Sequence, residues 1–166
     1  MKKLLLILIL TFSFQSWTNA DDIRDLQIED MSIGDSLLKY FNIMEINTYK
    51  ITIHNSNRYT TIEINKNLNN YDYIQISFLT NDVKKKIARL DGVINYKNNI
   101  DICYKKIEDI YKKIKSIVPN LNDEGKLTYK HSGDKTGKST VTDYVLETNK
   151  EDEIQIACYD YSKNYS

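Results

Sequence analysis

The chain has 166 residues, of which 23 are basic and 23 acidic, so its formal net charge is zero. This length suits one ordinary domain that buries its own core without the help of a bound group, and we expect no cofactor. The balanced charge gives no electrostatic attraction to nucleic acid or to an anionic membrane surface, and neither is expected as a partner.

The first segment, residues 1–20, is typical of a secretory signal peptide. Two lysines precede a run of mostly apolar residues, and small side chains end the segment at Ala20. The apolar run is too short for a retained anchor, because crossing a hydrocarbon core takes roughly 20 residues of helix. We therefore expect residues 1–20 to be cleaved and residues 21–166 to form a soluble exported domain, periplasmic or secreted, with no membrane segment.

The next part of the chain predicts two short helical turns followed by strands. Asp35 can cap a turn at 36–41, and Asn42 with Glu45 resembles the capping box of a second turn. Apolar and polar residues then alternate with a period of two, which is the pattern of a half-buried strand. The strands are expected at 59–64, 71–78 and 87–96.

Residues 100–117 carry the clearest helical pattern of the chain. Apolar residues recur there at spacings of three and four, with Cys103 among them. Glu108 precedes Lys112 by four residues, a spacing that stabilises helices, and Pro119 marks the end of the segment. The pattern predicts a helix with one isoleucine-rich face, which packs across a sheet.

The two cysteines, Cys103 and Cys158, are both expected to point into the core. Cys103 lies on the apolar face of the predicted helix, and Cys158 shares a strand face with Ile154 and Ile156. An even number of cysteines in an exported chain favours a disulfide. We predict a structural Cys103–Cys158 bond; the alternative is two free buried thiols that act as small apolar residues.

The C-terminal part predicts further strands around a polar segment. Strands are expected at 138–146 and 153–161, with a weaker one at 126–129. Apart from that weak strand, residues 119–138 are predicted to be a flexible polar loop. A long loop on a rigid scaffold is a usual place for binding contacts, so this segment is either an interaction loop or disordered. Its candidate interaction residues are Lys126, Lys130, His131, Lys135 and Lys138.

Both halves of the chain share the order of helix and then extended segments. Together they predict an α+β fold with a mostly antiparallel sheet and one long and one or two short helices packed on one face, consistent with two αβββ units. Short exported αβββ domains of outer-membrane assembly factors and of β-lactamase inhibitors resemble this pattern. That resemblance implies a binding protein.

Several segments also resemble small exported proteins of unassigned function from AT-rich bacterial genomes. They are MSIGDSLL at 31–38, the approach to the cysteine at 96–103, HSGDKTGK at 131–138 and Cys-Tyr-Asp at 158–160. The resemblance implies export and brings no activity, cofactor or site residue with it. AT-rich codon usage also accounts for the 13 tyrosines of the chain, so we do not interpret their abundance as a binding surface.

Residues 133–139, with the sequence GDKTGKS, come close to a phosphate-binding loop. Such a loop needs four residues between its first glycine and Gly-Lys-Ser, and a helix must follow it. Here only three residues separate the glycines, and the pattern of a strand follows. We interpret the motif as a lysine-rich hairpin or loop turn.

The sequence assigns no catalytic, cofactor-binding or metal-binding residue. His54 and His131 are the two histidines, and neither has the spacing of a metal ligand. These observations favour a non-enzymatic binding domain that works through the sheet face or the 119–138 loop. The expected partner is another periplasmic protein or an acidic component of the cell envelope. The alternative is a small cell-envelope hydrolase with Asp or Glu and His131 as acid and base.

Overall fold

The protein is seen in a computed structural model that describes residues 23–53, 57–96, 99–118, 120–148 and 152–163, so the predicted signal segment at 1–20 lies outside the described residues. The helices are α1 (Ile43–Ile46) and α2 (Ile100–Ile117), and the 3-10 turns are η1 (Ile23–Asp25) and η2 (Leu37–Lys39). The strands are β1 (Lys50–Ile53), β2 (Tyr59–Ile64), β3 (Tyr73–Leu79), β4 (Ile87–Val93), β5 (Asn122–Lys130), β6 (Thr140–Glu147) and β7 (Glu153–Asp160).

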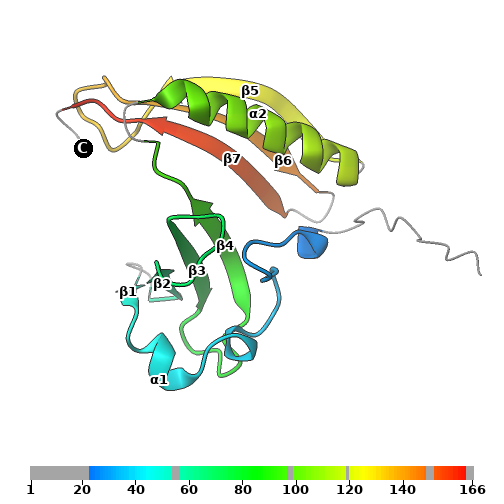
Figure 1. Ribbon diagram of the computed structural model, residues 1–166, viewed down its shortest axis with the longest axis vertical. Helices are drawn as coiled ribbons and strands as arrows, with labels where there is room; N and C mark the ends of the chain where they lie inside the picture. The colour runs from blue at the N-terminus through cyan, green and yellow to red at the C-terminus, as the bar shows by residue number, and fades with distance from the viewer. Residues whose placement is uncertain (1–22, 54–56, 97–98, 119, 149–151, 164–166) are drawn as a thin grey trace, which may run out of the picture.

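The strands form two separate antiparallel sheets (Figure 1). The first sheet has the order β1-β2-β3-β4, and the second has the order β5-β6-β7. The predicted α+β class is therefore confirmed, although the strands are divided between two sheets instead of forming one. The second half has the predicted αβββ order, whereas α1 in the first half precedes four strands. That residues 21–166 fold as a single domain stays a prediction.

The first sheet buries an isoleucine-rich face. Because side chains alternate along a strand, β2 and β3 each place every second residue on that face. The fully buried isoleucines of the two strands, at most 1% exposed, are Ile62, Ile64, Ile74 and Ile76. Leu37 of η2 and Ile46 of α1 belong to the same cluster, so the short elements before the sheet cover it. The predicted cap of α1 is present, since the Asn42 side chain accepts a hydrogen bond from the Glu45 N–H.

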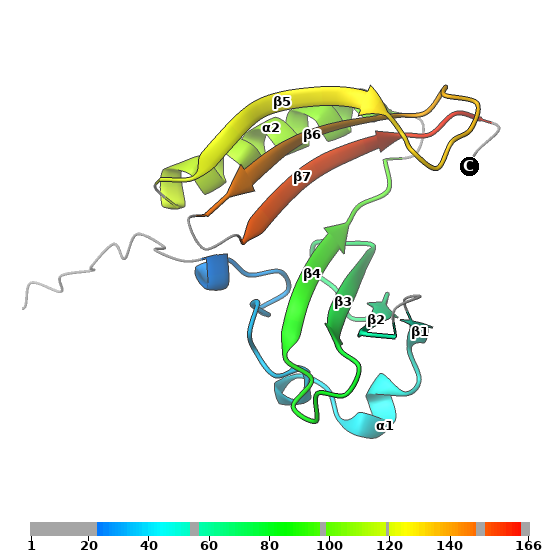
Figure 2. The ribbon, with the colours of Figure 1, turned by 180° about the vertical axis from the view of Figure 1, so that it is seen from behind.

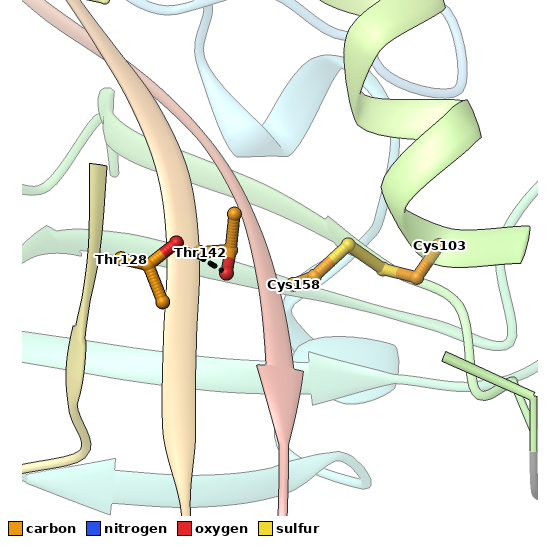
Figure 3. The surroundings of a disulfide bond; sticks show 4 residues. All are labelled: Cys103, Thr128, Thr142 and Cys158. Carbon is orange, nitrogen blue, oxygen red and sulfur yellow. Dashed lines mark hydrogen bonds between the residues drawn. A yellow bond between two sulfur atoms is a disulfide. The ribbon is translucent and has the colours of Figure 1, made fainter. Parts of the chain in front are cut away.

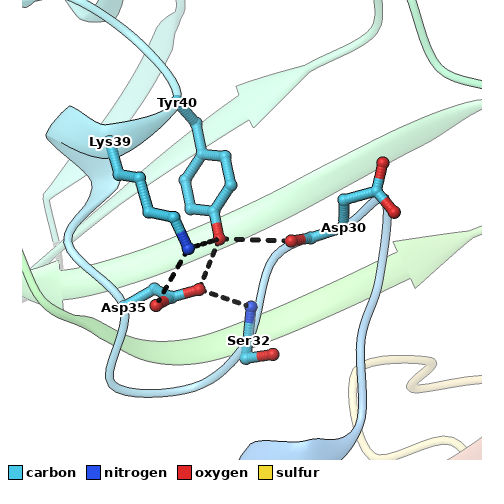
Figure 4. A network of polar contacts seen from close by, with 5 residues as sticks. All are labelled: Asp30, Ser32, Asp35, Lys39 and Tyr40. Atoms are coloured by element: carbon cyan, nitrogen blue, oxygen red, sulfur yellow. Dashed lines mark hydrogen bonds and ion pairs between the residues drawn. The ribbon is translucent and has the colours of Figure 1, made fainter.

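Polar contacts hold the segment that leads into this core (Figure 4). The Tyr40 hydroxyl donates to the Asp35 carboxylate, which also accepts from the Ser32 N–H at 3.3 Å. The ammonium group of Lys39 lies 3.6 Å from the other Asp35 oxygen. These contacts lower the pKa of Asp35, with the hydrogen bond from Tyr40 as the main cause. Asp35 therefore braces this segment, and it does not cap η2, which begins after Ser36.

Helix α2 lies across one face of the second sheet (Figures 1 and 2). Its Ile107 packs with Leu146 of β6 and Ile156 of β7. The Tyr111 ring stacks on Tyr144, with ring centroids 4.1 Å apart. The bounds of the helix and its packing on a sheet face agree with the sequence pattern. Within the described residues, no helix is both long and apolar enough to span a membrane.

The predicted disulfide connects α2 to β7 (Figure 3). The sulfur atoms of Cys103 and Cys158 lie 2.07 Å apart, and the two Cα atoms lie 5.9 Å apart. Cys158 is buried in the second core and pairs in register with Thr142 of β6. The Thr142 hydroxyl is hydrogen-bonded to that of Thr128 at 3.0 Å, so all three strands are linked at this level. The bond thus fixes the helix to β7, an edge strand of the sheet that pairs with the central strand β6.

The prediction of a flexible loop at 119–138 is wrong over much of that segment. Strand β5 occupies the middle of this segment and pairs with β6 in antiparallel register, with an irregularity between Asp123 and Lys126. Gly125 adopts a φ of 78° at this irregularity, a conformation that glycine adopts at little cost. The remaining connection, residues 131–139, is the hairpin loop between β5 and β6.

Candidate functional site

The face of the second sheet opposite α2 carries three half-exposed tyrosines; Figure 2 shows the sheet in front of the helix. Tyr129 of β5 and Tyr159 of β7 both pair with Val141 of β6, so the three side chains share this face. Tyr161 follows β7 and stacks on Tyr159 with 19° between the ring planes. Tyr129, Tyr159 and Tyr161, which we call the tyrosine face, are 45%, 44% and 47% exposed.

His131 joins the tyrosine face to the hairpin loop. The centroid of its ring lies 5.9 Å from that of Tyr159 and 5.4 Å from that of Tyr161, both in edge-to-face geometry. Aromatic rings favour this geometry because the positive ring edge of one meets the negative face of the other. The His131 Nδ1 also accepts a hydrogen bond from the Gly133 N–H at 3.2 Å. The loop and the tyrosine face therefore form one continuous surface.

Asp134 organises the hairpin loop. One carboxylate oxygen accepts from the N–H and the hydroxyl of Thr136, at 2.8 and 2.7 Å. The other accepts from the N–H and the hydroxyl of Ser139, at 2.9 and 2.6 Å. The Ser162 hydroxyl reaches the same oxygen at 3.3 Å, which ties down the chain just after Tyr161. These hydrogen bonds hold the pKa of Asp134 well below its usual range, and the bond from the Ser139 hydroxyl has the largest effect.

The Gly-Asp-Lys-Thr-Gly-Lys-Ser motif is thus a turn between two strands. Its aspartate is turned into the loop to accept hydrogen bonds, and β6 begins directly after its serine. A phosphate-binding loop would need a helix at that point. The interpretation of the motif as a hairpin turn is confirmed.

The predicted interaction lysines fall into two groups. Lys130, Lys135 and Lys138, which we call the hairpin lysines, are exposed at the hairpin end of the sheet; Lys130 is the last residue of β5, and the other two are on the loop. Lys126 lies further along β5, on the same strand face as Lys130, where its ammonium group sits 5.6 Å from the centroid of the Tyr104 ring of α2. Within the described part of the chain, none of the hairpin lysines forms an ion pair with a carboxylate.

A buried carboxylate lies beside the tyrosine face. Asp143, in the middle of β6, is 1% exposed, and its Oδ2 accepts from the Tyr129 hydroxyl at 2.8 Å and from the Gln155 amide at 2.7 Å. The hydrogen bond to Asp143 raises the pKa of Tyr129 to about 12. Among the described residues, Asp143 Oδ1 is the one buried side-chain oxygen or nitrogen without a hydrogen-bond partner. Leaving a buried acceptor unpaired costs about 1–3 kcal/mol, so an unpaired group in a folded protein calls for an explanation.

Sequence reasoning missed both Asp143 and the tyrosine face. The alternation of β6 placed Asp143 on the face away from the core, where a polar side chain is ordinarily solvated. Tyr129, which contacts it, ends the weak strand predicted at 126–129, and the sequence did not indicate that this strand pairs with the one that carries Asp143. The remaining tyrosines were attributed to codon usage. One signal was available, because Tyr159 and Tyr161 are two residues apart and therefore lie on the same side of an extended chain.

Within the described residues, no group of His, Cys, Asp and Glu side chains is placed to hold a metal ion. The chain matches no protein-family model, and it has no match among the curated proteins or the solved structures.

Proposed function

We propose that the protein is an exported, non-enzymatic binding domain that holds an acidic partner at the tyrosine face and the hairpin lysines. The observation that carries the proposal is the position of three half-exposed tyrosines at the end of the sheet that also carries three exposed lysines, which have no carboxylate partner among the described residues. The signal-like pattern of residues 1–20 and the Cys103–Cys158 bond support export, because disulfides persist in oxidising compartments.

The charges of the hairpin lysines favour an acidic partner. An exposed ion pair contributes only about 0–1 kcal/mol, so one lysine would not retain a ligand. Three lysines at one end of the sheet, one on β5 and two on the loop, act together, and they also raise the rate at which an anionic partner arrives. The tyrosines add apolar contact area at a small cost in side-chain entropy, which is why tyrosine is enriched in binding surfaces.

The hydrogen bonds of Asp134 support the same proposal because they order the loop before any ligand binds. The loop backbone is held at Thr136 and Ser139, and the chain after Tyr161 is held through Ser162. A surface that is already ordered loses less conformational entropy on binding, and more of the contact energy remains as affinity.

The alternative, a hydrolase that uses His131 with Asp or Glu, has less support. The contacts of His131 are those of a structural residue: its Nδ1 accepts from the Gly133 N–H at 3.2 Å, and its ring packs against Tyr159 and Tyr161. The nearby Asp134 uses both of its oxygens to hold the loop.

The test measures binding of the purified chain to two acidic probes, polyglutamate and polygalacturonate, by calorimetry at low and at physiological salt. We expect at least one probe to bind with an affinity that falls as salt rises. The triple variant Lys130→Gln, Lys135→Gln, Lys138→Gln should lose at least tenfold in affinity.

The matched control makes the same change in charge on the exposed side of α2, with Lys105→Gln, Lys106→Gln and Lys113→Gln. This control should bind as the wild type does. If neither probe binds, or if both triple variants lose affinity equally, the hairpin end is not an acidic-ligand site and the proposed function is wrong.

A further inference from the structure

We propose that the acidic partner is a saccharide chain, and that Asp143 accepts a hydrogen bond from one of its hydroxyl groups. This inference rests on the proposed function and adds to it the chemical class of the ligand. Asp143 becomes a specificity residue of the same surface.

The tyrosine face offers a platform for a sugar ring. Tyr159 and Tyr161 are nearly parallel, with 19° between their planes and 5.9 Å between their centroids, and each ring is about half exposed. The face of an aromatic ring is electron-rich, so it attracts the polarised C–H bonds on the flat side of a sugar ring. His131 packs edge-on against both rings and fixes their orientation.

Asp143 requires a ligand that donates hydrogen bonds. Its Oδ2 already accepts two, whereas its Oδ1 has no partner among the described residues. A sugar hydroxyl can donate to this oxygen. An acidic peptide can donate only from its backbone N–H groups, and its side-chain carboxylates, which are acceptors, would bring further negative charge close to Asp143. The buried carboxylate therefore favours a saccharide over an acidic peptide at this face.

The ligand reaches Asp143 Oδ1 only if a covering side chain moves, because Asp143 is 1% exposed. Gln155, one of the two exposed residues that donate to Oδ2, has a side chain that can rotate without breaking the backbone pairing of β7. Exposed side chains change rotamer within nanoseconds. The Tyr129 hydroxyl keeps its bond to Oδ2 during this movement.

The charged and uncharged parts of the surface lie in a line along the sheet. Asp143 is three residues into β6, so roughly 10 Å of strand separates it from the hairpin lysines. The row of Tyr129, Val141 and Tyr159 lies between them. A short oligosaccharide that places an acidic group at the lysines can therefore cover the tyrosines and present a hydroxyl to Asp143.

The test compares a galacturonic acid hexamer with a hexaglutamate peptide, which matches it in charge, by calorimetry on the full chain. We expect the saccharide to bind at least tenfold more tightly. The variant Asp143→Asn should reduce saccharide affinity about tenfold and leave peptide affinity unchanged or higher. The two donors, Tyr129 and Gln155, would hold the amide oxygen, so the amide NH₂ would replace Oδ1 and remove the acceptor.

A second variant, Tyr161→Ala, lies outside the strands and tests the stacking platform without disturbing the sheet. It should also reduce saccharide affinity about tenfold. Equal affinities for the two hexamers, or an Asp143→Asn variant with unchanged saccharide affinity, overturn the saccharide assignment while the proposed function stands. A preference for a single-stranded hexanucleotide over both probes overturns it as well. If nothing acidic binds, the proposed function itself fails.

Discussion

The two sheets differ in how the polar groups of their outer faces are hydrogen-bonded. On the first sheet, the hydroxyls of Thr61 and Ser77 are 2.7 Å apart, and the Gln75 amide donates to Glu63 at 3.3 Å. On the second sheet, the rings of the tyrosine face are half exposed and Asp143 Oδ1 has no partner among the described residues. The polar groups named on the first sheet pair with one another, whereas the unpaired buried acceptor on the second sheet marks a place to look for a ligand.

The two halves also differ in what holds them together. The first core is a cluster of isoleucines from β2 and β3, closed by short helical elements. The second core is smaller and depends on one helix, which the disulfide joins to β7. We therefore expect the second half to respond to loss of the cross-link and the first half to respond to changes in packing.

The largest effect is expected from the double variant Cys103→Ser, Cys158→Ser. The bond closes a loop with a sequence separation of 55 residues, and the chain-entropy model gives about 4 kcal/mol for its loss. Hydrogen exchange should show faster opening of β5, β6 and β7 while β2 and β3 keep their protection. An equal loss of protection in both sheets would mean that the two halves unfold as one unit, as the single-domain prediction requires.

A change in packing in the first half is made by the variant Gly92→Ala in β4. A Cβ at this position would lie 2.3 Å from the nearest atom of the Tyr71 ring, so the ring must shift. Overpacking of this kind costs about 1–3 kcal/mol, and the loss should appear in the unfolding of the first sheet. Urea unfolding measures it. Adding Tyr71→Leu should restore part of the stability; a double variant as unstable as Gly92→Ala alone would contradict the steric explanation.

The elements that the sequence predicted are those with a strong local pattern. α2 combines apolar residues at spacings of three and four with Glu108 and Lys112, which pair at 2.7 Å. β2 and β3 alternate isoleucine with polar residues. β1 was missed although Ile51 and Ile53 alternate, because the segment is short and lies at the edge of its sheet, where both side chains are about half exposed.

The candidate site was harder to predict because its chemistry depends on which strands meet. β5 shows a polar sequence on the face toward α2, where Lys126 and Thr128 contact a ring and a hydroxyl instead of an apolar core. Without β5 there is no Tyr129 beside Asp143, and an aspartate within a strand gives no sign that it is buried. The disulfide was predictable because helix period and strand period each place one cysteine toward the core.

Acid should weaken the second half by a smaller amount. Hydrogen bonds from Lys115 and Tyr111 lower the pKa of Asp123 to about 2, against about 3.9 in the unfolded chain. Because the folded pKa is lowered, this stabilisation is complete above pH 4 and is lost as the pH falls towards 2. We expect a loss of about 1 kcal/mol, allowing for solvent screening. Asp123→Asn should remove this part of the pH dependence, whereas Asp109→Asn, an exposed carboxylate on α2, should not.

The smallest expected effect is a shift in the titration of Tyr129, and it tests the feature that distinguishes the outer face of the second sheet from that of the first. Tyr129 should ionise near pH 12, because its hydroxyl donates to Asp143. The raised pKa means that this bond contributes fully below pH 10 and is lost as the pH rises through 12. The absorbance change near 295 nm, taken as the difference between wild type and Tyr129→Phe, isolates this titration from those of the other tyrosines. Asp143→Asn should return it towards the ordinary value of about 10, since the neutral amide no longer opposes the phenolate. If Tyr129 titrates near 10 in the wild type, Asp143 is not held in the described contact, and the second sheet would lose the feature that separates it from the first.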